Sequence, residues 1–177
     1  MVFAGSYGTN NILIEGGGSY VGNDGSISLY GNVWKAFELD TPYEATGNTH
    51  ISFDFELIEE AEGHALCTDE DTNDDTFGGS HKRCFAIAGT EYELWSDLHV
   101  KKTEKATIGT QTFSVKIGDI FPEIGTMINY IAFVQDNDNQ PLRGISRIKN
   151  IKLFDVKPVS LIFLSKILAL KIIGLTL

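Results

Sequence analysis

The sequence predicts an all-β domain, a β-sandwich or jelly roll of about ten short antiparallel strands. Residues 50–57 alternate between polar and apolar side chains, with Ile51, Phe53, Phe55 and Leu57 on one face. Such alternation is typical of a strand with one buried face. Short apolar runs elsewhere are separated by glycine and asparagine, which favour turns. No strand–helix–strand pattern and no internal repeat is visible, so a parallel α/β fold and a repeat fold are disfavoured.

The predicted strands share a short length, apolar or β-branched residues and flanking turn residues. In chain order they cover residues 12–14, 26–30, 34–39, 50–57, 63–67, 84–88, 92–95, 111–116, 127–134 and 145–154. These elements place one domain in residues 1–157, a length that is sufficient for a sizeable core.

Residues 158–177 form an apolar tail of a different character. The tail permits a helix, but Lys166 and Lys171 make it a poor membrane-spanning segment. Three interpretations stay open: an extraneous segment appended to a complete domain, an anchoring or partner helix, and a packed part of the fold. Contact with a membrane is expected only through this tail.

The charge of the chain argues against nucleic acid as a partner. The formal net charge is −10, and residues 157–177 contribute three lysines and no acid. Residues 1–156 therefore carry 14 − 3 = 11 basic and 24 acidic residues, a net charge of −13. Such a body repels nucleic acids and anionic membranes. Residues 1–5 do not resemble a secretory signal. Either the protein stays inside the cell, or this chain is a piece of a larger secreted protein, and we expect the second.

Two cysteines, Cys67 and Cys84, flank the first acidic loop. If strands lie on both sides, a disulfide between these cysteines closes that loop and indicates an extracellular location. Two buried free thiols are the alternative. A zinc site is disfavoured, because no CxxC pair or suitably spaced histidine completes it.

Two acidic runs, residues 69–75 and 136–139, follow apolar stretches. Clustered carboxylates repel one another unless a ligand satisfies them, and oxygen-rich loops suit calcium. Neither run is an EF-hand, because Asp74 or Pro141 stands where that loop needs glycine. We expect a structural calcium ion, with solvated loop charges as the alternative. The candidate ligands are Asp69, Asp71, Asp136, Asp138 and Asp155.

Residues 92–99 have the composition of a sugar-binding platform. Sugar rings present apolar C–H faces and hydroxyl rims, which suit a flat aromatic ring beside hydrogen-bonding groups. Trp95 and Tyr92 are predicted to stack on sugar, while Asp97, His99 and Arg143 make hydrogen bonds. A tryptophan packed in the core is the alternative for Trp95.

A basic group follows the second acidic run: Arg143, Arg147 and Lys149. These side chains are candidates for pairing with that run, or for binding sulfate or uronate groups of a polysaccharide. A solvated loop is the alternative.

Sequence signatures of common enzyme classes are missing. The chain has no G-x-S-x-G elbow, no H-E-x-x-H and no P-loop. The four histidines are scattered and have no recognisable motif partner. A lyase or glycosidase on a jelly-roll fold stays open, because its catalytic groups converge in space rather than in sequence.

The order of motifs resembles a known class of module. Residues 31–35 (GNVWK), 48–55 (NTHISFDF), 85–90 (FAIAGT), 130–138 (YIAFVQDND) and 148–153 (IKNIKL) follow one another in the chain. The series, over residues 20–155, resembles a β-sandwich module of secreted, often marine, bacterial polysaccharide-acting proteins. The resemblance implies non-catalytic carbohydrate binding outside the cell.

The sequence thus favours a calcium-stabilised polysaccharide-binding module that directs an attached or partner enzyme to glycan. The first alternative is a polysaccharide lyase or glycosidase on the same fold. The second is a calcium-dependent adhesion or structural module.

Overall fold

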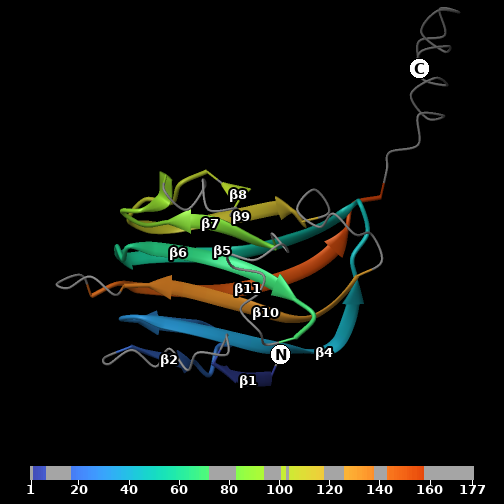
Figure 1. Ribbon diagram of the computed structural model, residues 1–177, viewed down its shortest axis with the longest axis horizontal. Helices are drawn as coiled ribbons and strands as arrows, with labels where there is room; N and C mark the ends of the chain where they lie inside the picture. The colour runs from blue at the N-terminus through green and yellow to red at the C-terminus, as the bar shows by residue number, and fades with distance from the viewer. Residues whose placement is uncertain are drawn as a thin grey trace, which may run out of the picture.

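The computed structural model describes residues 2–6, 17–71, 83–93, 101–102, 104–117, 126–137 and 143–157, and in them the chain forms eleven strands (Figure 1). The strands are β1 Val2–Ser6, β2 Gly18–Val21, β3 Ile27–Tyr30, β4 Val33–Glu44, β5 Thr49–Glu59, β6 Gly63–Asp69, β7 Cys84–Ala88, β8 Lys101–Lys102, β9 Gly109–Lys116, β10 Met127–Asp136 and β11 Ile145–Asp155.

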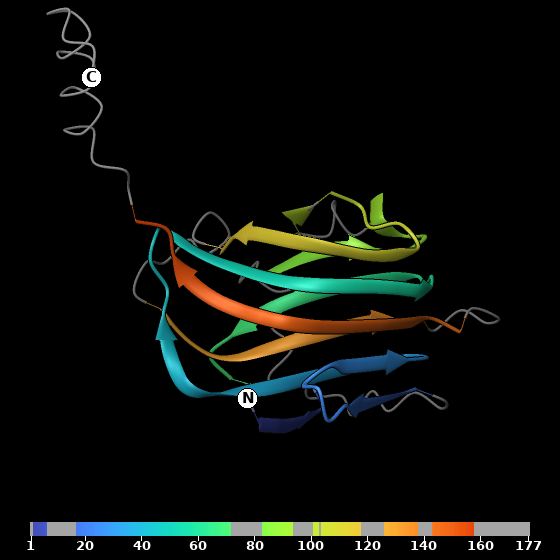
Figure 2. The same cartoon turned by 180° about the vertical axis from the view of Figure 1, so that it is seen from behind.

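The strands form two sheets that pack face to face, which confirms the predicted β-sandwich. One sheet has six strands in the order β1-β4-β10-β6-β7-β8, and the other has five in the order β2-β3-β11-β5-β9. Neighbouring strands are antiparallel apart from the parallel pair β7–β8. The six-stranded sheet faces the viewer in Figure 1 and the five-stranded sheet in Figure 2.

The core lies between the sheets and is rich in phenylalanine. Phe53 and Phe55 of β5 face Phe85 and Phe133 of the other sheet, and all four rings are almost fully buried. The rings of Phe53 and Phe85 lie 6.2 Å apart. Strand β5 alternates between buried and half-buried residues from Thr49 to Leu57, as its sequence predicts. Each such ring contributes about 1.5–3 kcal/mol of burial free energy.

Most predicted strands are confirmed, and one is wrong where the structure describes it. Tyr92 and Glu93 take a helical backbone conformation instead of a strand. The reason is local: Gly89 has a φ of 125°, and the amide of Tyr92 donates to the Gly89 carbonyl at 3.3 Å. This turn ends β7. The predicted strand at 12–14 lies outside the described residues, and β1, β2 and β8 were not predicted.

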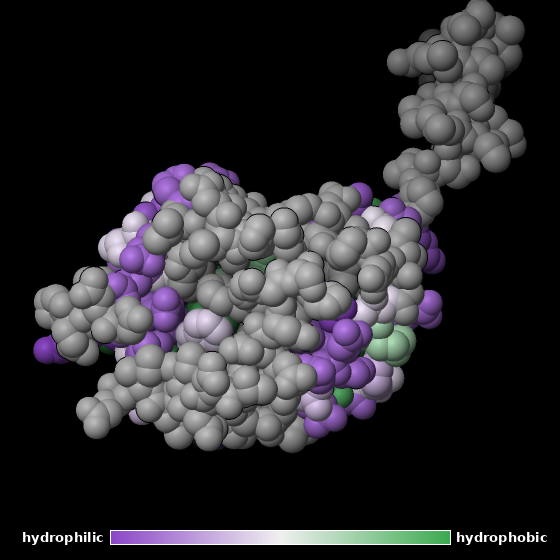
Figure 3. Space-filling model, viewed as in Figure 1, coloured by the Kyte–Doolittle hydropathy of each residue, from purple (hydrophilic) through white to green (hydrophobic). Residues whose placement is uncertain are grey.

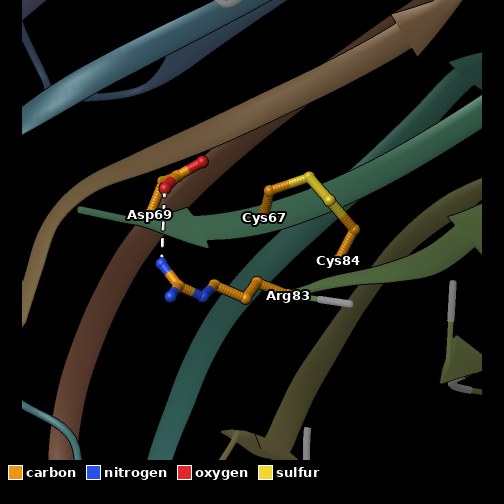
Figure 4. The surroundings of a disulfide bond; sticks show 4 residues. All are labelled: Cys67, Asp69, Arg83 and Cys84. Carbon is orange, nitrogen blue, oxygen red and sulfur yellow. Dashed lines mark ion pairs between the residues drawn. A yellow bond between two sulfur atoms is a disulfide. The ribbon is translucent and has the colours of Figure 1, made fainter. Parts of the chain in front are cut away.

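The predicted disulfide is confirmed. Cys67 of β6 and Cys84 of β7 are directly opposite each other in the ladder and are joined by a disulfide (Figure 4). Both are fully buried, on the face of the six-stranded sheet that points away from the core. The bond therefore ties together the two strands that flank the first acidic loop.

The apolar tail at 158–177 lies outside the described residues, so its three interpretations stay predictions. Within the described residues, no helix has the length and apolar character needed to span a membrane.

Candidate functional site

The residues predicted to bind sugar are only partly described. Trp95, Asp97 and His99 lie outside the described residues, so their roles stay predictions. Tyr92 is 5% exposed and packs on the outer face of the six-stranded sheet, with the Lys105 ammonium 5.9 Å from its ring centre. Its ring has little surface for a ligand in this conformation. The predicted stacking role of Tyr92 therefore requires the groups that bury its ring to move aside.

Arg143 is exposed and lies at one end of the sandwich, which we call the Gly31 end. The amide of Gly31 donates to the carbonyls of Arg143 and Gly144, at 2.8 and 3.0 Å. Gly144 packs closely against Ala61, because a Cβ built on Gly144 would lie only 2.7 Å from the Cβ of Ala61. The Ala61 carbonyl accepts a hydrogen bond from the amide of Thr90, which lies in the turn that leads to Tyr92. The fold thus brings Arg143 and the turn that leads to Tyr92 to the same end, although they are 51 positions apart in the chain.

The first acidic run is partly neutralised by an arginine. Asp69 is 1% exposed and lies 3.5 Å from the guanidinium of Arg83, which also pairs with Glu70 at 3.1 Å (Figure 4). The Asp69 carboxylate also accepts the Glu70 amide at 2.7 Å. A buried carboxylate with these partners does not need a cation to be satisfied. Asp71 is exposed beside this pair.

Another metal candidate, Asp136, lies apart from Asp69. In the β6–β10 ladder, Asp69 pairs with Tyr130 at one end and Asp136 with Gly63 at the other. Six residues of strand separate these ends, about 20 Å. Asp155 closes β11, where Thr49 and Thr46 donate to its Oδ1 at 2.7 and 3.1 Å.

The candidates described therefore do not form one shared calcium site. Among the residues that the structure places, no three acidic, histidine or cysteine side chains are grouped to hold a metal. Asp138 lies outside the described residues. Calcium binding thus stays a prediction.

The outer face of the five-stranded sheet carries two tyrosines that sequence analysis did not select. Tyr20 of β2 is 62% exposed and Tyr30 of β3 is 50% exposed. Tyr20 pairs with Ser28, two residues from Tyr30, so both rings are on one face. Diagonal neighbours of this kind have Cα atoms about 7–8 Å apart. Two aromatic rings therefore stand side by side in solvent.

A glycine allows one of these rings to lie on the sheet. Gly18 is directly opposite Tyr30 in the β2–β3 pair. A Cβ built on Gly18 would lie 2.2 Å from the Tyr30 hydroxyl oxygen and 2.4 Å from its Cζ. The Tyr30 ring thus occupies the space that a side chain at position 18 would fill, and its other face is exposed. This is the geometry of an aromatic platform.

Polar side chains continue this face next to the tyrosines. The register places Tyr20, Ser28, Arg147 and Glu56 in one row across β2, β3, β11 and β5. Arg147 donates from Nη1 to Glu56 at 3.2 Å and from Nε to Ser28 at 3.4 Å. The row therefore offers an aromatic ring, a hydroxyl, a guanidinium and a carboxylate to a ligand.

The next row is centred on Asp54. Thr112 and Asn150 each donate to one of its carboxylate oxygens at 2.6 Å. The hydrogen bond from Thr112, then that from Asn150 and the nearby charges of Lys149 and Lys152, hold the pKa of Asp54 below its ordinary value. Asp54 is therefore an ionised hydrogen-bond acceptor at neutral pH.

The opposite outer face, on the six-stranded sheet, has a different composition. Its centre holds the aromatic rings of Tyr92, Trp34 and Tyr130, the last two partly buried, together with small and almost fully buried side chains: Ala36, Ala65, Ala86, Ala132 and Val134. Figure 3 shows this side of the molecule, where the described residues that reach the surface are mostly hydrophilic. The exposed aromatic pair thus belongs to the five-stranded sheet.

Sequence analysis missed Tyr20 and Tyr30 because exposure of an aromatic ring depends on its cross-strand neighbour. The available signal was that Tyr30 alternates with buried Ile27 and Leu29 on a short strand. The glycine opposite the tyrosine, at position 18, can be identified only when the register is known.

Comparisons with known proteins give only distant structural matches. No family model and no curated protein matches the chain. One similar solved structure is a family 61 carbohydrate-binding module in complex with β-1,4-galactotriose: 13% identity, TM-score 0.41, covering 81% of this chain and 84% of that one. Another is a low-affinity xylan-binding module, CBM86, from the gut symbiont Roseburia intestinalis: 10% identity, TM-score 0.38, covering 77% and 84%.

A third similar structure is an exo-β-agarase, with 15% identity and a TM-score of 0.36. It is matched over 84% of this chain but only 23% of its own length. At these identities the similarity concerns the arrangement of strands and carries no conclusion about ligand. Two of these three similar structures are carbohydrate-binding modules.

Proposed function

We propose that this protein is a non-catalytic polysaccharide-binding module whose binding surface includes the outer face of the five-stranded sheet. One observation carries the proposal: Tyr20 and Tyr30 are exposed side by side, and Gly18 leaves room for the Tyr30 ring to lie on the strand. An aromatic ring fixed in this way loses little conformational freedom when a sugar ring stacks on it.

The polar row beside the tyrosines supplies the second requirement of sugar binding. Hydroxyl groups of a sugar are both donors and acceptors, so their site needs groups of both kinds. Arg147 and Asn150 are donors, while Glu56 and Asp54 are acceptors. These side chains are held by one another, which favours a pre-organised surface.

A binding role suits this face better than acid–base catalysis. A catalytic acid needs a carboxyl group that stays protonated near neutral pH, which requires a raised pKa. The pKa of Asp54 is lowered by its hydrogen bonds, and Glu56 is paired with Arg147. The buried disulfide fits an oxidising compartment, so we also propose an extracellular location.

Affinity gel electrophoresis and calorimetry against β-1,4-galactan, xylan and agarose test the proposal. Tyr30→Ala and Tyr20→Ala should each weaken binding at least tenfold, as expected for an anchoring aromatic residue. Gly18→Ala should weaken binding as well, because the new Cβ displaces the Tyr30 ring. Ile108→Ala is the matched control, since Ile108 is exposed and apolar but precedes β9, at the opposite edge of the sheet from Tyr20 of β2.

The variant Trp95→Ala distinguishes binding by this face from binding by residues 92–99. If Trp95→Ala abolishes binding while the three sheet variants bind normally, the sheet face is not the site. The assay should also measure new reducing or unsaturated ends. Retention without product supports a binding module, whereas product formation with wild-type protein would mean that the chain is an enzyme.

A further inference from the structure

One part of the outer face of the five-stranded sheet, from the row of Arg147 to that of Phe154, is locally basic, although the protein is acidic. From the row of Arg147 to that of Phe154, four basic and two acidic side chains point outward. They are Arg147, Lys149, Lys152 and Lys116, against Glu56 and Asp54. These rows therefore have an excess of two positive charges. Glu59 lies opposite Ile145, in the row on the other side of Arg147, and including it would leave an excess of one positive charge. The whole chain has a net charge of −10, so this face stands out from the rest of the molecule.

A β-bulge places two of these lysines on the same face. Lys149 pairs with Asp54 and Lys152 with Ser52, so two residues of β11 lie opposite one residue of β5. Asn150, inside the bulge, has a φ of 56°. Residues three apart in a regular strand point to opposite faces. The extra residue therefore brings Lys149 and Lys152 to the outer side together.

The two lysines are available to a ligand. Arg147 pairs with Glu56, but Lys149 and Lys152 are exposed and make no ion pair among the residues that the structure describes. Asp54, the acidic group nearest to them in the ladder, is satisfied by Thr112 and Asn150.

The basic group is continuous with the tyrosine platform. Tyr20 lies two strands from Arg147 in the same row, and Lys149 lies two residues further along β11. Strand spacing and rise place the Cα atoms of Tyr20 and Lys149 about 12 Å apart. One extended glycan can therefore stack on a tyrosine and place an anionic substituent near a lysine.

We propose that the polysaccharide bound by this face is anionic, bearing sulfate esters or uronate carboxylates. The inference rests on the proposed function. Its physical basis is that an unpaired ammonium group gains more from a charged oxygen than from a neutral hydroxyl. An acidic protein repels polyanions elsewhere on its surface, so the charge excess also orients the ligand toward this face.

The test uses polymers that differ only in charge. A sulfated galactan is compared with its chemically desulfated form, and polygalacturonate with its methyl-esterified form, by calorimetry on the full chain. The charged member of one pair should bind more tightly, and its affinity should fall as salt is raised. Which pair responds identifies the anionic group as sulfate or carboxylate.

Two double variants with the same net charge show whether the preference for the charged polymer depends on the lysines of this face. Lys149→Gln with Lys152→Gln should weaken binding of the charged polymer roughly three- to thirtyfold. Lys105→Gln with Lys157→Gln is the control, because both lysines are exposed and lie outside the strands whose rows carry the basic group. The control should bind like the wild type, and both double variants should keep the wild-type unfolding temperature to within a few degrees.

Three results would overturn the inference. If both members of each pair bind equally and the lysine variants match their control, the module binds neutral glycan and the proposed function stands alone. If no polymer binds, the proposed function fails too. If single-stranded DNA competes with equal affinity and needs the same lysines, the face is a general polyanion surface.

Discussion

His64 is a buried, titratable residue whose surroundings favour the neutral form. The side chain is 1% exposed, its Nε2 accepts the Ala61 amide at 3.2 Å, and its ring packs edge-on against Phe55 at 5.6 Å. Burial lowers the pKa of His64 from 6.5 to about 3, because the core penalises the charged imidazolium. The unfolded chain therefore binds a proton at this residue at a pH where the folded protein does not.

The first prediction concerns pH. Since the unfolded state binds the extra proton, the free energy of unfolding should fall as pH decreases from 6.5 toward 3, by about 1.4 kcal/mol per pH unit. Urea unfolding at pH 7, 5.5 and 4.5 measures this slope. Asp54 and Asp155, whose pKa values are lowered, lose their contributions only below their ordinary pKa of 3.8.

His64→Gln is the control, because glutamine can accept the Ala61 amide and does not titrate. This variant should be less stable at pH 7 but should lose the slope between pH 6.5 and 4.5. Equal slopes in the two proteins would mean that His64 is not the group responsible.

Strands β5 and β6 show how far patterning determines an element. The alternation in β5 predicted its buried face residue by residue, because one side of this strand meets water. Strand β6 and strand β7 are buried on both faces. Their outward positions are occupied by small residues such as Ala65, Cys67 and Ala86. Sequence patterning predicted these strands but not their double burial, which depends on long-range contacts.

In the candidate site, too, some features were predictable from the sequence and others depended on long-range contacts. The disulfide was predictable, because two cysteines beside two strands have few other partners. The tyrosine pair was not, because it depends on the register between β2 and β3 and on Gly18. The strand predicted at 92–95 was wrong at Tyr92 and Glu93, the two positions that the structure describes, because local composition did not reveal the turn that begins at Gly89.

The second prediction concerns the link between β6 and β7. The Cys67–Cys84 disulfide closes a loop of 17 residues. Replacing both cysteines with alanine should lower the free energy of unfolding by about 3 kcal/mol, because the unfolded chain regains loop entropy. Urea unfolding measures the loss. Fully reduced wild-type protein should have a similar stability, and a double variant as stable as oxidised wild type would contradict the entropic role of the bond.

At the scale of the whole molecule, acidic groups are distributed over both ends of the sandwich. Asp69 is neutralised by Arg83 and Asp155 is held by two threonines, whereas Asp136 is half-buried at the Gly31 end. An ion bound at this end would stabilise the folded state by mass action. Calcium binding stays a prediction, and Asp136 is the candidate ligand with which it is tested at this end.

The third prediction tests calcium on the full chain. After chelator treatment, added calcium should raise the unfolding temperature, with about 2.7 kcal/mol gained at a hundred times the dissociation constant. Asp136→Asn should abolish the shift, while Asp155→Asn should keep it, because hydroxyl donors already satisfy that carboxylate. Magnesium is the control ion. A shift of equal size with magnesium, or none with calcium, would show that no selective calcium site exists.

The bulge at Asn150 has a consequence for how this protein can change during evolution. Beyond Asn150, the strand has Lys152 and Phe154 toward solvent, while Ile151 and Leu153 pack against the core. Loss of the Asn150 codon would remove the extra residue and restore regular alternation, with Lys152 still opposite Ser52 and both sides of the strand unchanged. Surface loops tolerate changes in length, and the extra residue gives this position of β11 the same tolerance, whereas in a regular strand a shift of one residue exchanges the two sides.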